Sequence, residues 1–249
     1  MKIGLIIVGD EILSGRRADQ HLPKVVAMLN ARGLQLAWVR VIGDDRKLLE
    51  DTYRETLATD DLVFSTGGIG ATPDDLTREA VARAAGIPLE RHPEGVQLLQ
   101  KFARQRGRTL QDEHYRMVEF PAGATLVPNP ANGIPGFSVG NHHFVPGFPE
   151  MAWPMIEWLL DHRYRHLHNN QYVERALTVT GKYESELNPL LEAIDAGYPA
   201  VKLFCLPTMQ NDLPVNEVGL KGNLADVKVA LEDLKHRLTA AGCEWQNSG

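Results

Sequence analysis

The first half of the chain alternates between two hydrophobic patterns. Residues 2–8 form a continuous β-rich run, typical of a strand that is buried on both faces. Residues 22–29 place their apolar side chains at helical spacing, and Gly33 follows where such a helix would end. The pattern therefore predicts a buried strand followed by an amphipathic helix.

This strand–helix order repeats along the chain. The apolar patterns predict strands over residues 34–43 and 61–65, and helices over residues 46–59, 76–85 and about 96–103. Repeated strand–helix–strand units connect parallel strands and place helices on both faces of the sheet. We therefore expect an α/β fold with a mostly parallel sheet.

The pattern changes near the middle of the chain. Residues 126–151 are rich in proline, glycine and asparagine, and a helix is expected over residues 151–160. Gly140-Asn141 is a turn signal for a β-hairpin, so His142 and His143 are interpreted as surface or rim residues.

A polar stretch without periodicity at residues 168–171 predicts a boundary between two domains. The first domain, residues 1–168, contains the alternating strands and helices. The second, residues 172–249, is expected to be a small α+β domain with a β-α-β-β-α order.

Composition and charge exclude several classes of protein. A net charge of −6 argues against a nucleic-acid partner, because phosphates attract clustered cations. Cys205 and Cys243 are too few for a disulfide framework and indicate a reducing compartment. The first apolar run meets Asp10 too early for a signal peptide, and no stretch reaches the ~20 apolar residues of a membrane span. We therefore expect a cytoplasmic protein without a membrane partner.

Glycine and acidic residues occur together at the ends of three predicted strands. These ends read VGDEILSG, VIGDD and STGGIGATPDD. Ligands of parallel sheets bind beyond the carboxyl ends of the strands, where the three segments would meet. The segments together predict a binding site at this edge of the sheet.

The glycine-rich segment at residues 66–77 does not fit the common phosphate-binding motifs. It has no lysine, which a P-loop requires, and Pro73 stands where a dinucleotide-binding fingerprint has its third glycine. What remains is a turn in which Gly67, Gly68 and Gly70 let backbone N–H groups approach an anion ahead of a helix. The segment is therefore a candidate phosphate site.

Two adjacent carboxylates, Asp74 and Asp75, would repel phosphate unless a cation lies between them and the phosphate. Mg²⁺ binds one or two carboxylates together with phosphate oxygens. Asp75 with Asp44 or Asp10 is therefore the predicted Mg²⁺ site. Asp10 and Glu11 form a second candidate pair of metal ligands, and ordinary loop acids are the alternative for both.

Other candidates also have a purely structural interpretation. Thr72, Pro73 and Asp75 suit the N-cap, N1 and N3 positions of a helix. Ser14 and Gly15 are candidate phosphate donors, and turn chemistry explains them equally well.

The motifs, taken in order, resemble a known family. VGDEILSG, VIGDD, TGGIGATPDDLTREA, PNPANGIPGF and VPGFPEM span about residues 1–165 and are similar to the CinA-type molybdopterin-binding domain of the MoaB/Mog group. The resemblance implies a three-layer α/β/α sandwich with a pocket for a pterin phosphate or a nucleotide. The second domain looks like the KH-like appendage of CinA proteins. Members of the group form dimers or trimers, which implies a homo-oligomer.

The resemblance also implies roles for single residues. It places the catalytic acids at Asp75 and Asp44. With Asp10 and Glu11, which are candidates from their place at a strand end, these two make up the predicted set of Mg²⁺ ligands. The Thr-Gly-Gly-Thr-Gly motif of Mog proteins aligns on residues 66–70. The loops and the resemblance together give the candidate ligand-binding residues. They are Gly67, Gly68, Gly70, Thr72, Thr77, Ser14, Gly15, Pro146 and Gly147.

The chain departs from the Mog pattern at two positions. Ile69 replaces the threonine of the motif, and Arg78 replaces a proline. Three functions remain open. The first is binding of molybdopterin or an adenine nucleotide with Mg²⁺ in molybdenum cofactor biosynthesis, where Mog-type enzymes transfer an adenylyl group from ATP to the pterin. The second is a metal-dependent pyrophosphatase acting on ADP-ribose or FAD. The third is a non-catalytic binding module or scaffold.

Overall fold

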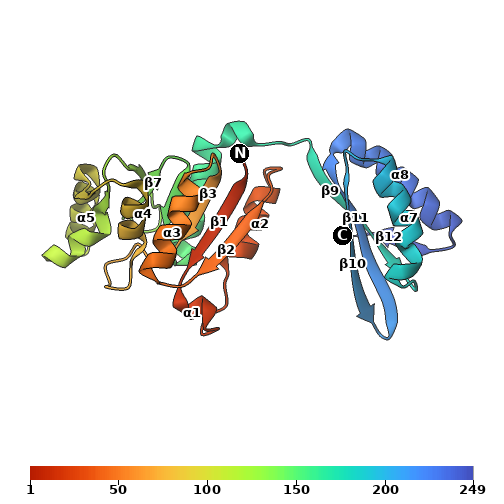
Figure 1. Cartoon of the computed structure of the whole chain (residues 1–249), viewed down its shortest axis with the longest axis horizontal. Helices are drawn as coiled ribbons and strands as arrows, with labels where there is room; N and C mark the ends of the chain where they lie inside the picture. The colour runs from red at the N-terminus through yellow and green to blue at the C-terminus, as the bar shows by residue number, and fades with distance from the viewer. Residues whose placement is uncertain (249) are drawn as a thin grey trace. The chain divides into compact units, whose positions relative to one another are not determined.

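The computed structural model describes residues 1–248. It contains two compact units, one comprising Met1–His168 and the other beginning at Asn169. Each unit has its own sheet and its own hydrophobic core (Figure 1). In the described residues, no helix combines the length and the apolar character needed to cross a membrane.

The first unit is built on a six-stranded, mostly parallel sheet in the order β2-β1-β3-β8-β7-β6. Four parallel strands are followed at one edge by β7, which is antiparallel to β8, and by β6, which is antiparallel to β7. The strands are β1 (Ile3–Val8), β2 (Trp38–Ile42), β3 (Leu62–Thr66), β8 (His142–Val145), β7 (Gly136–Val139) and β6 (Thr125–Val127). The predicted α/β class with a mostly parallel sheet is confirmed.

Helices cover both faces of this sheet because the buried strands carry apolar side chains on both sides. Ile3, Leu5 and Ile7 of β1 pack in one core cluster with helices α2 (His21–Asn30) and α6 (Pro149–Trp158). Ile6 and Val8 face the other cluster. The helices that contribute to this second cluster are α3 (Arg46–Leu57), α4 (Thr77–Ala85) and α5 (Pro93–Gln105). The unit is therefore a three-layer sandwich (Figure 1).

Short elements complete the first unit. They are α1 (Asp10–Leu13), the two-stranded sheet of β4 (Leu89–Arg91) and β5 (Glu119–Pro121), the 3₁₀ segments Asp112–Val118 and Arg165–Leu167, and the short π-helix Leu159–Arg163.

The interpretation of His142 and His143 as surface residues is wrong. Their exposed fractions are 2% and 0%, because β8 lies between β3 and β7 and both faces of the sheet are covered. His143 hydrogen-bonds the Ser138 hydroxyl through Nδ1 at 2.7 Å and the Tyr164 hydroxyl through Nε2 at 2.6 Å. Burial lowers the pKa of His143 to about 3 and the pKa of His142 to about 4, so both imidazoles are neutral near pH 7.

The second unit packs two helices against a four-stranded antiparallel sheet in the order β10-β11-β9-β12. Its elements are β9 (Tyr172–Thr180), α7 (Glu184–Gly197), β10 (Lys202–Gln210), β11 (Leu213–Asn223), α8 (Leu224–Ala240) and β12 (Glu244–Asn247). The sequence pattern does not predict β12, since only Trp245 of its four residues is a large apolar residue.

Candidate functional site

The glycine-rich loop after β3 needs glycine because it packs tightly. Gly67 and Gly68 have φ values of +97° and +68°, in the left-handed region that side chains disfavour. A Cβ atom on Gly67 would collide with the carbonyl oxygen of Val8, and one on Gly68 would collide with the Thr77 hydroxyl. The two glycines therefore let the loop lie against both the end of β1 and the start of α4.

Thr77 and Arg78, at the start of α4, hold this loop through hydrogen bonds to its carbonyl groups. The buried Thr77 hydroxyl donates to the Gly67 carbonyl at 3.1 Å, and the Thr77 N–H donates to the Gly68 carbonyl at 3.0 Å. The Arg78 guanidinium, 5% exposed, donates to the carbonyl of Ile69. Burial lowers the pKa of Arg78, opposed most strongly by the negative charge of Asp75. Ile69 and Arg78, the two residues that differ from the Mog pattern, therefore contact each other.

The Asp75 carboxylate turns back into its own loop. Its Oδ1 accepts the Gly70 N–H at 2.8 Å, and its Oδ2 accepts both the Thr72 N–H at 2.8 Å and the Thr72 hydroxyl. Helix α4 begins only at Thr77, and its N-cap residue Leu76 makes no side-chain capping bond. The helix-start interpretation of residues 72–75 is therefore wrong, and Asp75 occupies the position of an anion at the glycine-rich loop.

Asp10 and Asp44 tie together the loops after β1 and β2. The Asp10 N–H donates to Asp44 Oδ2 at 3.0 Å, and the Asp44 N–H donates to Asp10 Oδ1 at 3.2 Å. Burial raises the pKa of Asp44, and the charges of Asp10, Glu11 and Asp74 raise it further, against the lowering effect of the Asp10 N–H. Negative charge is therefore crowded at this edge of the sheet.

Two cavities meet at the carboxyl ends of the parallel strands. The smaller, about 160 Å³, is termed the acidic cavity because four carboxylates line it: Glu11, Asp44, Asp74 and Asp75. The larger, about 480 Å³, is termed the apolar cavity, and its large apolar lining residues include Ile69, Met117, Ile134, Phe148 and Met151. Gly68, Gly147 and three of the carboxylates line both cavities, so the two form adjoining parts of one site.

The structure brings most of the predicted site residues to this region and leaves others away from it. Asp44 and Gly67 line the acidic cavity, Gly70, Thr72 and Pro146 line the apolar cavity, and the residues that line both include Glu11, Gly68, Asp75 and Gly147. Asp10, Ser14, Gly15 and Thr77 line neither. Within residues 1–248, no three Asp, Glu, His or Cys side chains converge as a ready-made metal site.

Several residues of the site were not identified from the sequence. Arg17 lines the acidic cavity, and Asn129 and Asn132 line the apolar one. Asn129 accepts the Ala131 N–H at 3.0 Å and Asn132 accepts the Ile134 N–H at 2.8 Å, so both asparagines shape the loop that bears them. The PNPANGIPGF motif marked this loop, but its position over the cavity depends on tertiary packing.

Comparison with known proteins follows the same division of the chain. Residues 4–166 match the sequence model of the family described as "Probable molybdopterin binding domain". A CinA-like protein of Anaeromyxobacter dehalogenans (strain 2CP-C) is 38% identical over 167 residues, which are 65% of this chain and 41% of the relative. A CinA-like protein of Citrifermentans bemidjiense is 30% identical over 248 residues, which are 96% of this chain and 59% of the relative.

A solved structure supports the fold of the first unit. The crystal structure of CinA from Thermoplasma acidophilum, a protein of unknown function, superposes with a TM-score of 0.58 at 26% identity, covering 65% of this chain and 98% of that one. The chain spans 41% to 59% of the length of the two CinA-like relatives above. Because the family model covers well over half of the sequence, the chain belongs to the family of molybdopterin-binding domains, of the kind found in CinA-like proteins.

Proposed function

We propose that the first unit binds a phosphate-bearing pterin or nucleotide across the two adjoining cavities, with Mg²⁺ in the acidic one. The observation that carries this proposal is the pairing of a carboxylate-lined cavity with an apolar cavity at one glycine-rich loop. The apolar cavity, with Met117, Phe148 and Met151 in its wall, suits a flat ring. The phosphate end would lie at the glycine-rich loop, beside Gly68 and Gly70. The Gly67 N–H already donates to the Val145 carbonyl at 3.0 Å.

The donor chemistry of the acidic cavity fits Mg²⁺. Carboxylate oxygens are its usual protein ligands, and a cation would offset the burial and the neighbouring negative charges that raise the pKa of Asp44. Asp44 and Asp75 would hold the ion together with the phosphate oxygens, while Asp10 orients Asp44 through the paired hydrogen bonds. When bound, the ion supplies the positive charge that lets phosphate approach these acids.

Asp75 would exchange partners when a phosphate arrives. Its oxygens accept the N–H groups of Gly70 and Thr72, the groups that a glycine-rich loop offers to an anion. A phosphate oxygen that takes these N–H groups displaces the carboxylate and frees it for the cation. The loop can then hold both a phosphate and an adjacent aspartate without repulsion between them.

Asp75→Asn tests this proposal. The amide keeps nearly the same size and one acceptor oxygen but loses the charge, so we expect Mg²⁺-dependent binding of ATP to weaken roughly tenfold or more, the scale of a lost metal contact. Isothermal titration calorimetry of the full chain, with and without Mg²⁺, provides the measurement. Asp60→Asn, at an exposed acid that lines neither cavity, is the matched control and should bind as the native chain does.

Two results would contradict the proposal. Unchanged ATP affinity in Asp75→Asn would remove Asp75 from the binding site. A variant that no longer unfolds cooperatively would show that the hydrogen bonds to Gly70 and Thr72 serve the fold alone.

The four carboxylates of the acidic cavity also favour a second candidate, hydrolysis of the pyrophosphate in ADP-ribose or FAD. In this function a bound divalent ion would stabilise charge on the phosphoryl oxygens, and Asp44 would accept a proton from the attacking water. Incubation with FAD or ADP-ribose and Mg²⁺, Mn²⁺ or Co²⁺ should release AMP, and Asp44→Asn should abolish the release. Binding without AMP would support the first function, and neither binding nor AMP would support a scaffold.

A further inference from the structure

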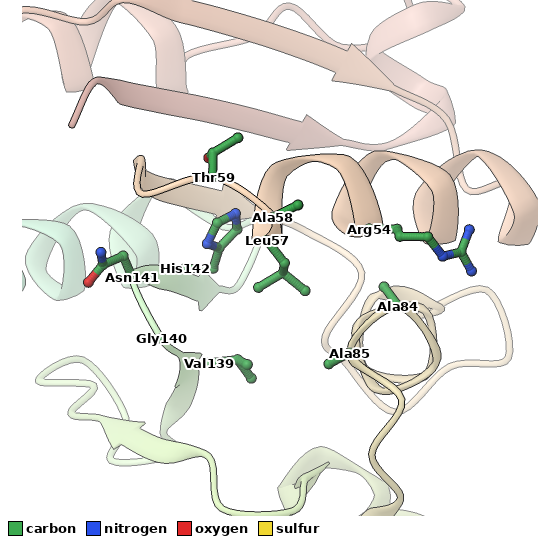
Figure 2. Close-up of a pocket in the computed structure, with 10 residues that line it drawn as sticks. All are labelled: Arg54, Leu57, Ala58, Thr59, Ala84, Ala85, Val139, Gly140, Asn141 and His142. Atoms are coloured by element: carbon green, nitrogen blue, oxygen red, sulfur yellow. The ribbon is translucent and has the colours of Figure 1, made fainter.

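A third cavity, of about 620 Å³, lies at the opposite end of the parallel strands, and Figure 2 shows its lining residues. Strands β3 and β8 run in parallel, with Val63 opposite His142 and Thr66 opposite Val145. His142, at the start of β8, lines this cavity, whereas Pro146, just after its end, lines the apolar cavity. The length of the strand, about 13 Å, separates the two. This cavity is termed the helix-end cavity and is independent of the proposed ligand site.

The last residues of two helices line the helix-end cavity. Leu57–Ala58 at the end of α3 and Ala84–Ala85 at the end of α4 are part of its wall. The final carbonyl groups of a helix lack partners within that helix, and the helix dipole places partial negative charge there. The side chains at these ends are small and apolar. N–H groups beyond the helices already bond the carbonyls of Thr56, Ala82 and Arg83. The acceptors that the cavity offers are therefore the carbonyls of its lining residues Leu57, Ala58, Ala84 and Ala85.

The cation nearest to this cavity is already paired. Arg54 lines the cavity, but its guanidinium binds the carboxylates of Glu50 and Asp51 on its own helix. Figure 2 shows the Arg54 side chain directed away from His142. Two acids of its own helix thus balance the charge of Arg54.

His142 adds an unpaired ring nitrogen to this wall. Its side chain is almost completely buried, and its Nε2 has no hydrogen-bond partner among residues 1–248. Because burial lowers the pKa of His142 to about 4, the ring is neutral near pH 7 and has one nitrogen that can accept a hydrogen bond. A buried polar group without a partner costs about 1–3 kcal/mol, which a donor from a ligand would offset.

We propose that the helix-end cavity binds a small organic cation, a primary amine attached to an apolar ring or short chain. The ammonium group donates to the carbonyls at the ends of α3 and α4 and to the His142 ring. Leu57, Ala85 and Val139 contact the apolar part. Because Nε2 is shielded from solvent, binding would require a shift of the exposed Gly140-Asn141 turn, whose Asn141 carbonyl accepts the Val63 N–H at 3.0 Å. A carboxylate in the same place would face two negative helix ends and is rejected.

Three probes of equal size and different charge test this proposal: benzylamine, benzyl alcohol and benzoate. Each is titrated at pH 7.5 into the ¹⁵N-labelled full chain, and the amide signals of Ala84, Ala85 and Gly140 are followed by NMR. We expect benzylamine to shift these signals with a Kd at least tenfold below that of benzyl alcohol, and benzoate to leave them unchanged. Equal shifts with benzoate, or no shift with benzylamine, would overturn the proposal.

Two variants locate the binding. Ala85→Phe, at an exposed position, fills the cavity and should abolish the benzylamine shifts, whereas Ala241→Phe at the exposed end of α8 should not. His142→Phe keeps a buried ring but removes the acceptor, so affinity should fall about tenfold. If His142→Phe does not fold, the Ala85→Phe result decides alone. Undiminished binding in Ala85→Phe, or cavity signals that move with protein concentration rather than with amine, contradicts the proposal.

Discussion

Gly67→Ala is expected to destabilise the first unit by about 2–5 kcal/mol and to abolish ligand binding at the glycine-rich loop. The left-handed φ of +97° alone costs a side chain roughly 1–2 kcal/mol. The new methyl group also collides with the Val8 carbonyl oxygen, and because this atom is backbone, relief requires β1 and the loop to separate, at about 1–3 kcal/mol. Guanidinium-induced unfolding and calorimetry with ATP and Mg²⁺ measure the two effects.

Gly123→Ala is the matched control for this substitution. Gly123 has a φ of +77°, and a Cβ atom there meets nothing within 4 Å. It should therefore show only the cost of the left-handed backbone, roughly 1–2 kcal/mol, and normal ligand binding. If the two variants lose equal stability, the close approach of Gly67 to Val8 contributes nothing, and our explanation of the loop fails.

The free energy of unfolding of the first unit is expected to fall by roughly 4 kcal/mol between pH 6.5 and pH 4.5. In the folded chain His142 and His143 have pKa values of about 4 and about 3, below the ordinary value of 6.5 that applies after unfolding. Their contribution is complete above pH 6.5 and is lost as the pH falls, because only the unfolded chain takes up protons in this range. Denaturant unfolding at several pH values, monitored by NMR signals of the first unit, measures the decline.

Single substitutions separate the two histidines. His142→Phe should reduce the slope of stability against pH to that of one proton, about 1.4 kcal/mol per pH unit, since His143 alone then titrates. His166→Gln, at an exposed histidine, should leave the slope unchanged. A native chain whose stability stays constant from pH 6.5 to pH 4.5 would show that the two rings accept protons without cost. Measurement above pH 4.5 keeps most carboxylate titration out of the window.

The sequence predicts the sheet and its helices well because hydrophobic periodicity depends on which face of an element is buried. Residues 2–8 read as a strand buried on both faces, and β1 packs against core clusters on both sides of the sheet. His142 and His143 read as a polar turn, yet they are buried. Their burial depends on β8 pairing between β3 and β7, a contact between residues far apart in the sequence that no local pattern records.

The candidate site shows the same limit at the level of single side chains. The rule that ligands bind at strand ends predicts which loops meet, and Asp44 and Asp75 do line one cavity. It does not predict where each side chain points. Thr77 supports the glycine-rich loop and Asp10 holds Asp44, because hydrogen bonds to nearby backbone satisfy both groups. Such choices depend on local geometry of less than an ångström, which residue spacing does not contain.

The carboxylate that Asp75 folds into its own loop makes every incoming anion a competitor. The affinity of the site for a ligand then depends on a difference in binding free energy. The two groups compared are the anionic group of the ligand and the Asp75 carboxylate that it replaces. Under the proposed function, a singly charged carboxylate would gain little from this exchange, whereas a doubly charged phosphoryl group would displace the Asp75 side chain. The site would therefore select among ligands by the charge of their anionic group, before the ring of the ligand makes any contact.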